Sequence, residues 1–167
     1  MLSRLQGSNR HRRSPGSDGE AWAVVEVDPA WFLQLWCRPG SSHPDVAYQS
    51  PATWPLDRKF PWPDRHFGQG CANPVPLATV SCKLRRLETP VWHRWLLWKV
   101  LARVDVTEHP VLTFTDGVTR TIWLLTHGVT AMLVKCAMAD AARLQALAGV
   151  DGGQPVAVGT LFKQKMD

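Results

Sequence analysis

Residues 112–135 read LTFTDGVTRTIWLLTHGVTAMLVK and carry the clearest structural signal in the chain. A β-rich run ends at Asp116-Gly117, an amphipathic run of about ten residues follows, and a second β-rich run begins after Gly128. Glycine at position 128 is typical of a helix C-terminus. We therefore predict a βαβ-like unit with a very tight first turn, made of a strand over 110–115, a helix over 117–126 and a strand over 129–136.

The turn over residues 116–120 is predicted to hold an anionic group such as a phosphate. The first turn of a helix leaves backbone N–H groups unpaired, and the helix dipole places partial positive charge there. Gly117 lets a ligand approach the backbone, and Thr119 and Thr121 add hydroxyls. The Arg120 guanidinium can hold two phosphate oxygens at once. The competing interpretation is an ordinary turn in which Asp116 caps the helix and Arg120 forms a surface salt bridge.

The rest of the chain shows weaker signals of both kinds of element. Apolar runs predict strands over residues 21–27 and 75–82. Asp28-Pro29 is typical of a helix start, and Gly149 of a helix end. Apolar residues at three- and four-residue steps favour a helix in the run VWHRWLLWKVLARV. The helices predicted from these signals cover residues 29–37, 91–104 and 137–148.

Residues 39–75 contain seven prolines, which exclude long helices and central strands. The same segment carries Trp54, Phe60, Trp62 and Phe67, and a disordered linker rarely carries so many rings. We therefore expect an ordered loop that packs on the domain. Long ordered loops are often functional.

The nine tryptophans of this 167-residue chain have two interpretations. They can be core residues of a small domain, or some can stack on bases or on a partner protein. Trp92, Trp95 and Trp98 would share one side of the predicted helix over 91–104, where core packing and a partner-binding patch are the alternatives.

The run of apolar strand, Asp-Gly-x-x-Arg, apolar helix, glycine and apolar strand resembles the signature of the ParB/sulfiredoxin superfamily. More narrowly, the chain resembles the plasmid fertility inhibition factors. This narrower resemblance rests on SHPDVA at 42–47, NPVPLA at 73–78 and FTDGVTRTIWLL at 114–125. The resemblance implies an α/β (α+β) fold of ParB/sulfiredoxin-like type, with a small mixed sheet and flanking helices.

The superfamily resemblance also implies a role for Gly117 and Arg120, because its Gly-x-x-Arg turn contacts nucleotide phosphates. Sulfiredoxins place a catalytic cysteine directly after that glycine, and ParB clamps place a glutamate there. This chain has Val118 at that position. Sulfinic-acid reduction is therefore not expected. Classical centromere binding is not expected either, because the segment after Cys136 is too short for a helix-turn-helix domain.

The family resemblance implies that the protein blocks conjugative transfer of a co-resident plasmid, in one of three forms. In the first it is an ATPase or DNase in which Arg120 clamps phosphate charge and Asp116 binds a metal or water, with a nucleotide and a divalent metal as cofactors. In the second it is a non-catalytic protein that docks on the conjugative coupling or secretion machinery. In the third it is a basic nucleic-acid-binding module, in keeping with the net charge of +5.

Residues outside the turn supply further candidates for the site. His43 and Asp45 flank Pro44 and could act as acid–base partners or metal ligands, whereas a simple turn is the competing interpretation. Lys59 could neutralise phosphate charge, and Asn73 could orient a ligand. A solvated lysine and a strand-entry turn are the corresponding alternatives. The accessory candidates are therefore His43, Asp45, Lys59 and Asn73.

The domain organisation follows from composition. We predict a disordered basic arm over residues 1–20, one domain over 21–148 and a weakly ordered tail over 149–167. No run reaches ~18 apolar residues, and the opening residues lack the apolar run of a signal peptide, so we expect no membrane span and a cytoplasmic protein. The widely spaced cysteines are then expected to be free thiols: Cys37, Cys71, Cys82 and Cys136.

Overall fold

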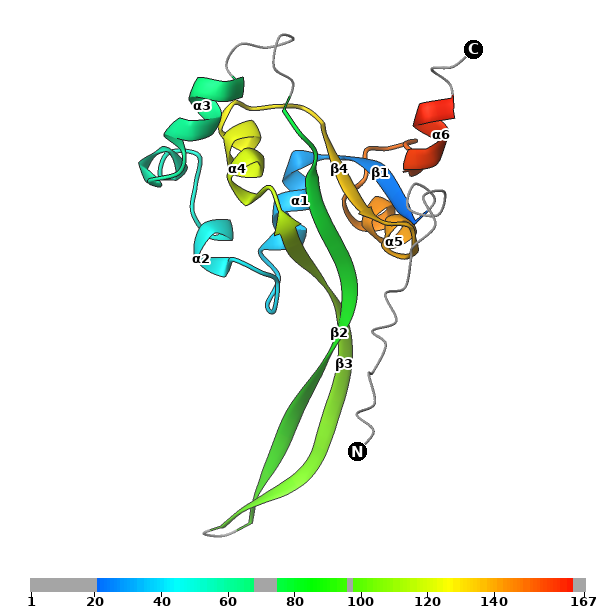
Figure 1. Cartoon of the computed structure of the whole chain (residues 1–167). Coiled ribbons are helices and arrows are strands. Elements are labelled where there is room, and N and C mark those ends of the chain that lie inside the picture. The colour runs from blue at the N-terminus through cyan, green and yellow to red at the C-terminus, as the bar shows by residue number, and fades with distance from the viewer. Residues whose placement is uncertain (1–20, 68–74, 96–97, 164–167) are drawn as a thin grey trace, which may run out of the picture.

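A computed structural model of the chain describes residues 21–67, 75–95 and 98–163. Its centre is a five-stranded mixed sheet in the order β3-β2-β4-β1-β5, with helices against it (Figure 1). The sheet confirms the predicted fold class. The strands are β1 (Trp22–Val27), β2 (Ala78–Trp95), β3 (Trp98–Asp116), β4 (Met132–Ala137) and β5 (Val156–Ala157). The helices are α1 (Pro29–Trp36), α2 (Pro44–Ala47), the 3₁₀ helix η1 (Trp54–Leu56), α3 (Pro61–Phe67), α4 (Val118–Thr126), α5 (Met138–Ala148) and α6 (Val158–Lys163).

The core lies on one face of the sheet. Alternate residues such as Val25 of β1 and Val134 of β4 are buried, while Glu26 and Leu133 on the other face are exposed. Helix α5 packs against β1, β2 and β4, and α1 packs against β3 and α5. The α1 side chains contact the ring of Phe114 in β3, so this helix holds the end of β3 that leads into the predicted turn.

Helix α1 begins where its sequence signal predicts. The Asp28 carboxylate accepts hydrogen bonds from the backbone N–H groups of Ala30 (2.8 Å) and Trp31 (2.9 Å), as an N-cap does. Pro29 occupies the first turn, where its missing N–H costs nothing. The predictions of β1 and α5 are also confirmed, each within one residue at its ends.

The strand–helix–strand unit over residues 110–136 is present as the end of β3, α4 and β4. Its two strands are not parallel, however, because β2 lies between them, antiparallel to β3 and parallel to β4. The βαβ-like arrangement is therefore wrong, since a βαβ unit joins parallel strands. The lengths of two strands and of the helix that joins them do not determine whether another strand lies between the two in the sheet.

The predicted helix over residues 91–104 is also wrong. Apart from residues 96–97, which lie outside the described residues, this range belongs to β2 and β3. The two strands form a long antiparallel ribbon from Thr79↔Asp116 out to Trp95↔Trp98, with a bulge opposite Trp92 (Figure 1). The strand predicted over 110–115 is the inner end of β3, and the strand predicted over 75–82 is present only from Ala78, where β2 begins. Apolar residues at helical spacing also fit a strand pair when β-branched and aromatic residues dominate the segment.

The proline-rich segment is an ordered loop as far as Phe67, as predicted. Its short helices α2, η1 and α3 are compatible with the prolines, several of which occupy first turns. Trp54, Phe60 and Phe67 are buried against the domain. The remainder of this segment, residues 68–74, lies outside the described residues.

The two ends of the chain were predicted to be poorly ordered. The basic arm over residues 1–20 lies outside the described residues. In the segment after Gly149, β5 pairs with β1 and α6 follows it, so regular structure extends into the predicted tail. Among the described residues, no helix has the length and apolar character needed to cross a membrane.

Candidate functional site

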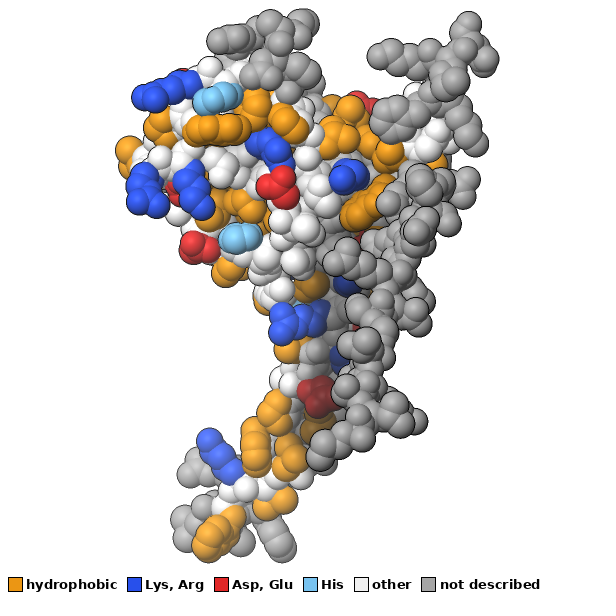
Figure 2. Space-filling view, viewed as in Figure 1, with side chains coloured by type: hydrophobic (Ala, Val, Ile, Leu, Met, Phe, Trp, Pro, Cys, Tyr) orange, Lys and Arg blue, Asp and Glu red, His pale blue; other side chains and the backbone are white. Residues whose placement is uncertain are grey.

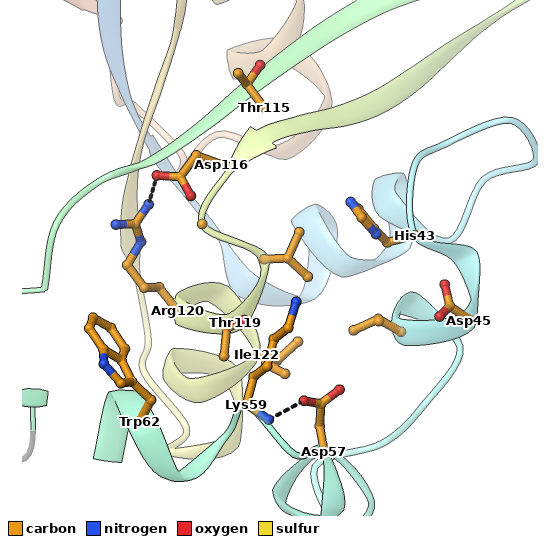
Figure 3. A pocket seen from close by; sticks show the side chains of 13 residues that line it. His43, Asp45, Asp57, Lys59, Trp62, Thr115, Asp116, Thr119, Arg120 and Ile122 are labelled. Carbon is orange, nitrogen blue, oxygen red and sulfur yellow. Dashed lines mark hydrogen bonds and ion pairs between the residues drawn. The ribbon is translucent and has the colours of Figure 1, made fainter. Parts of the chain in front are cut away.

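A cleft of about 760 Å³ lies where β3 ends and α4 begins (Figure 3). One wall is the predicted anion turn and the first turn of α4. The other wall comes from the proline-rich loop, which is distant in sequence. The residues that line the cleft are His43, Asp45, Val46, Asp57, Lys59, Trp62, Thr115, Asp116, Gly117, Val118, Thr119, Arg120 and Ile122.

Gly117 forms the sharp bend between β3 and α4. Its φ of 97° lies in the left-handed region, which residues with a Cβ rarely adopt. A Cβ at this position would also lie 2.7 Å from the Ala78 backbone and 3.0 Å from the Arg120 guanidinium. Gly117 therefore lets the bend pack tightly against β2 and Arg120, and it also lines the cleft. Its predicted role in admitting a ligand stays a prediction.

Arg120 lies at this bend and faces the cleft (Figure 3). Its side chain is 16% exposed, and its Nη2 atom donates a hydrogen bond to the Asp116 carboxylate at 2.5 Å. Its buried Nε atom has no hydrogen-bond partner among the described residues. The guanidinium is thus held close to the helix N-terminus by a carboxylate that is itself 72% exposed.

Residues of the first turn of α4, Val118 and Thr119, line the cleft, and the first backbone N–H groups of a helix have no partner within it. No side chain caps this helix, since its N-cap residue is Gly117 and Asp116 pairs with Arg120 instead. In the competing interpretation of an ordinary turn, the capping role of Asp116 is therefore wrong, whereas the salt bridge of Arg120 is present. An uncapped helix N-terminus beside a guanidinium has the chemistry of an anion site.

The two threonines of the turn lie differently. Thr119 lines the cleft, in agreement with its predicted place. Thr121 is 1% exposed, and its hydroxyl donates to the Gly117 carbonyl at 3.0 Å. Because that hydroxyl is buried inside the turn, it stabilises the bend and does not face the cleft, contrary to its predicted contact with phosphate.

His43 and Asp45 line the opposite wall (Figure 3). Two serines fix this wall to β3: the Ser41 hydroxyl accepts from Leu112 N–H at 3.0 Å, and the Ser42 hydroxyl accepts from Phe114 N–H at 2.9 Å. His43 follows directly in the left-handed region, with a φ of 52°. A histidine in this conformation is uncommon and marks a tightly determined position.

Lys59 and Trp62 complete the cleft. The Lys59 side chain extends towards the turn in Figure 3, while its backbone N–H is bound by Asp57 at 2.7 Å. The indole of Trp62 is 55% exposed and is supported by stacking on His66 (4.3 Å between centroids) and by the edge of Phe67 (5.5 Å). The remaining accessory candidate, Asn73, lies outside the described residues.

The cleft has mixed charge. Arg120 and Lys59 bring positive charge, and three carboxylates face them from Asp45, Asp57 and Asp116. Within the described ranges, no group of three or more His, Cys, Asp or Glu side chains converges tightly enough to hold a metal ion by itself. The cleft therefore combines two cationic side chains with three carboxylates, of which Asp116 is already paired with Arg120.

The sequence reasoning missed several lining residues, above all Asp57, Trp62 and Thr115. Thr115 was within reach of prediction because it directly precedes the turn. Asp57 and Trp62 carry no local signal of a site, because only the path of the proline-rich loop brings them to α4. The one available indication was the number of aromatic rings in that loop.

The thiols lie away from this cleft. Cys37, Cys82 and Cys136 are free, as predicted, and Cys71 lies outside the described residues. Burial raises the pKa of the Cys136 thiol to about 11, and the nearby Asp140 and Cys82 add to this effect. Burial also raises the pKa values of Cys82 and Cys37. Such thiols are poor nucleophiles at neutral pH.

The chain is similar in sequence and in structure to known proteins. The family described as PFIN, plasmid fertility inhibition factor, matches residues 24–149. Protein osa of Shigella flexneri is 31% identical over 111 residues, which are 66% of this chain and 47% of that protein. The crystal structure of the oncogenic suppression activity protein, a plasmid fertility inhibition factor, is 30% identical with a TM-score of 0.64. That match covers 90% of this chain and 68% of the other. This chain thus spans about half the length of the curated relative.

Proposed function

The chain belongs to the plasmid fertility inhibition factor family, and from this membership we propose that it blocks conjugative transfer of a plasmid that shares its cell. We place the activity in the cleft between α4 and the proline-rich loop. The observation that carries this proposal is the position of Arg120, whose guanidinium lies against the uncapped N-terminus of α4 and faces the cleft.

The ligand proposed for this cleft is the phosphate of a nucleotide or of nucleic acid. A guanidinium and free backbone N–H groups together recognise phosphate oxygens. The half-exposed indole of Trp62 offers a flat apolar surface at the rim, on which a base can stack. A nucleotide unit supplies both kinds of group, which free phosphate does not.

The carboxylates of the cleft restrict how the phosphate binds. Asp116 already pairs with Arg120, and Asp45 and Asp57 add further negative charge. A bare phosphate would be repelled by all three groups. We therefore propose that the phosphate arrives with a divalent cation, which the carboxylates and phosphate oxygens would share, as oxygen ligands commonly do for Mg²⁺.

The test is a thermal-shift screen of ATP, CTP, GTP and inorganic phosphate, each with and without Mg²⁺. A nucleotide should raise the melting temperature of the wild type and leave Arg120→Ala unchanged. Arg58→Ala is the matched control, because Arg58 is an exposed arginine of the same loop that does not line the cleft. Equal stabilisation of wild type and Arg120→Ala would reject the site.

The same variants separate binding from biological effect in a plasmid-transfer assay. We expect Arg120→Ala to lose transfer inhibition and Arg58→Ala to keep it. If Arg120→Ala loses ligand binding but still inhibits transfer, inhibition depends on docking to another protein and not on the cleft. Hydrolysis of nucleotide or DNA by the wild type, with Asp116→Ala as control, tests whether binding leads to catalysis.

A further inference from the structure

The β2–β3 ribbon projects beyond the body of the domain (Figure 1). Its side chains contact the body as far out as Arg85, which donates to the Gly40 carbonyl at 3.3 Å. The pairing of the two strands continues outward from there to Trp95↔Trp98. We call the outer part of this pairing, residues 90–95 and 98–104, the ribbon end.

The ribbon end is apolar on both of its sides. The strand register places Trp92, Leu101 and Val104 on one side, and it places Trp98 and Val100 on the other. These five side chains are between 44% and 76% exposed, and Figure 2 shows hydrophobic side chains along this part of the ribbon. A flat protein partner would cover one side of a ribbon and leave the other side in water. The arrangement therefore fits surroundings that enclose the ribbon end from both sides.

The charged residues of the ribbon end are all basic. Between Glu88 and Asp105 the sequence holds Arg94, Lys99 and Arg103 and no acidic residue. Acidic residues follow nearer the body, and the Arg103 Nε atom lies 2.9 Å from the Asp105 carboxylate where the two regions meet. The ribbon thus changes along its length, from mixed charge near the body to a basic and apolar end.

We propose that the ribbon end inserts into the surface of a lipid bilayer that contains anionic lipids. A bilayer encloses an inserted hairpin on both sides. Tryptophan rings concentrate at the headgroup level of membranes, and basic side chains beside them are attracted to anionic headgroups. The grooves of duplex DNA present mainly hydrogen-bonding groups between phosphates, which do not complement the exposed valines and leucine of the ribbon end.

The free strand edges limit the depth of this insertion. Within the described part of the chain, the strands of the ribbon end pair only with each other, so their outer edges keep unpaired backbone groups. Such edges do not enter the hydrocarbon core, whereas an interfacial segment is buried by roughly 5–10 Å. The three strand residues beyond Trp92 span about 10 Å. Insertion to this depth places Trp98 and Lys99 among the headgroups and leaves the acidic residues in water.

Cosedimentation of the full chain with lipid vesicles tests the proposal. One set of vesicles contains phosphatidylcholine alone, and the other also contains the anionic lipid phosphatidylglycerol. The wild type should bind the anionic vesicles at least about tenfold more tightly than the neutral ones, because several basic residues approach the surface together. Added salt should weaken this binding, since it screens the attraction.

Two leucines of the ribbon provide a matched pair of variants. Leu101 in the ribbon end is 47% exposed, and Leu87, which lies nearer the body than Glu88, is 48% exposed. Leu101→Glu should weaken binding to anionic vesicles at least about tenfold, because it places a carboxylate among apolar groups and anionic headgroups. Leu87→Glu makes the same change about 17 Å further from the membrane and should leave the binding unchanged.

Charge reversal tests the electrostatic part without removing an apolar side chain. Lys99→Glu should weaken binding to anionic vesicles at least about fivefold. Lys83→Glu makes the same change near the body, beyond the range of the surface potential, and should bind as the wild type does. Arg120→Ala should also bind as the wild type does, which separates this surface from the cleft.

Circular dichroism checks that each variant is folded. A wild type that does not bind anionic vesicles would overturn the proposal, and so would equal losses in Leu101→Glu and Leu87→Glu. Binding of the wild type to duplex DNA without binding to vesicles would assign the ribbon end to nucleic acid and reject the membrane as its partner.

Discussion

At the scale of single residues, the guanidinium of Arg120 is the centre of the cleft chemistry. Its Nη2 atom is bound by Asp116, four residues earlier, and the pair closes across the bend at Gly117. Ion pairs with this spacing on an exposed surface contribute little to stability. The pairing matters more for binding, because the Asp116 carboxylate occupies a donor that a phosphate oxygen would use.

Asp116→Asn is therefore expected to strengthen the binding of inorganic phosphate without added metal by about three- to tenfold. The substitution removes the negative charge and keeps the shape of the side chain, so Arg120 keeps its place with a free positive charge. Isothermal titration of phosphate into both proteins measures the change. In the presence of Mg²⁺ the order should reverse if Asp116 holds the cation. Weaker phosphate binding without metal would contradict a competing role for Asp116.

The position of His43 depends on contacts that its two preceding serines make with a distant strand, and the local sequence does not reveal that strand. Its left-handed backbone follows Ser41 and Ser42, whose hydroxyls bind N–H groups of β3. The pattern His43-Pro44-Asp45 suggested paired polar groups on a loop. The hydrogen bonds from Ser41 and Ser42 to β3 determine that His43 and Asp45 line the cleft beside α4.

At the scale of elements, the junction of β3 and α4 is the most constrained part of the site. The strand ends at Asp116, the helix begins at Val118, and Gly117 alone makes the change of direction. Ala78 of β2 packs directly against this glycine. The junction thus ties the helix N-terminus to the sheet, which keeps Arg120 and the backbone N–H groups in fixed positions.

Gly117→Ala should lower the free energy of unfolding by about 2 to 4 kcal/mol, since it adds a clash with Ala78 to the cost of a positive φ. Urea unfolding measures the loss. Gly128→Ala is the control: Gly128 also has a positive φ, of 65°, but a Cβ there meets nothing within 4 Å. It should cost only about 1 to 2 kcal/mol. Equal losses would show that packing against Ala78 is unimportant.

The β2–β3 ribbon is the element that sequence patterns described least well. Trp95, Trp98 and Leu101 follow one another at three-residue steps, which fit a helix face. The same segment holds Val91, Val100 and other β-branched or aromatic residues that favour strands. The pairing of residues 79–95 with residues 98–116 satisfies the backbone groups between the strands, and local spacing does not report this pairing.

At the scale of the whole molecule, the cleft joins parts of the chain that are far apart in sequence. The turn over residues 116–120 meets a loop that begins about seventy residues earlier, and the hydrogen bonds from Ser41 and Ser42 to β3 hold that loop in place. Contacts of α4 with α3 and η1 close the other end. The lining residues are therefore available only in the folded chain.

Buried thiols give the whole molecule a pH-dependent stability in alkaline solution. Below pH 9.0, the ordinary pKa of a thiol, Cys136 is protonated in both folded and unfolded chains. As the pH rises towards the folded value of about 11, the unfolded chain releases this proton while the folded chain keeps it. The free energy of unfolding should therefore fall across this range, by on the order of 1 to 3 kcal/mol from this group.

Urea unfolding of the wild type and of Cys136→Ala at several pH values in this range measures that contribution. Cys136→Ala loses packing at every pH, so the informative quantity is the slope of stability against pH. The slope should be shallower in Cys136→Ala. All other titratable groups are common to both proteins, so their contributions cancel in the comparison. Parallel curves would contradict the raised pKa.

The sequence by itself determined the local features of this protein. Asp28-Pro29 specified the start of α1, and Asp116-Gly117 specified the end of β3 and the start of α4, because caps and left-handed turns depend on a few adjacent residues. The family resemblance was likewise carried by short runs, and the match over residues 24–149 confirms it.

Only the tertiary structure decided which strands are neighbours and which loop faces the turn. Pairings between distant residues decide the placement of β2 between β3 and β4 and the extension of the ribbon through residues 91–95 and 98–104. They also decide the approach of Asp57 and Trp62 to α4. The physical reason is that backbone hydrogen bonds and apolar burial are satisfied between segments. Each segment alone is compatible with more than one partner.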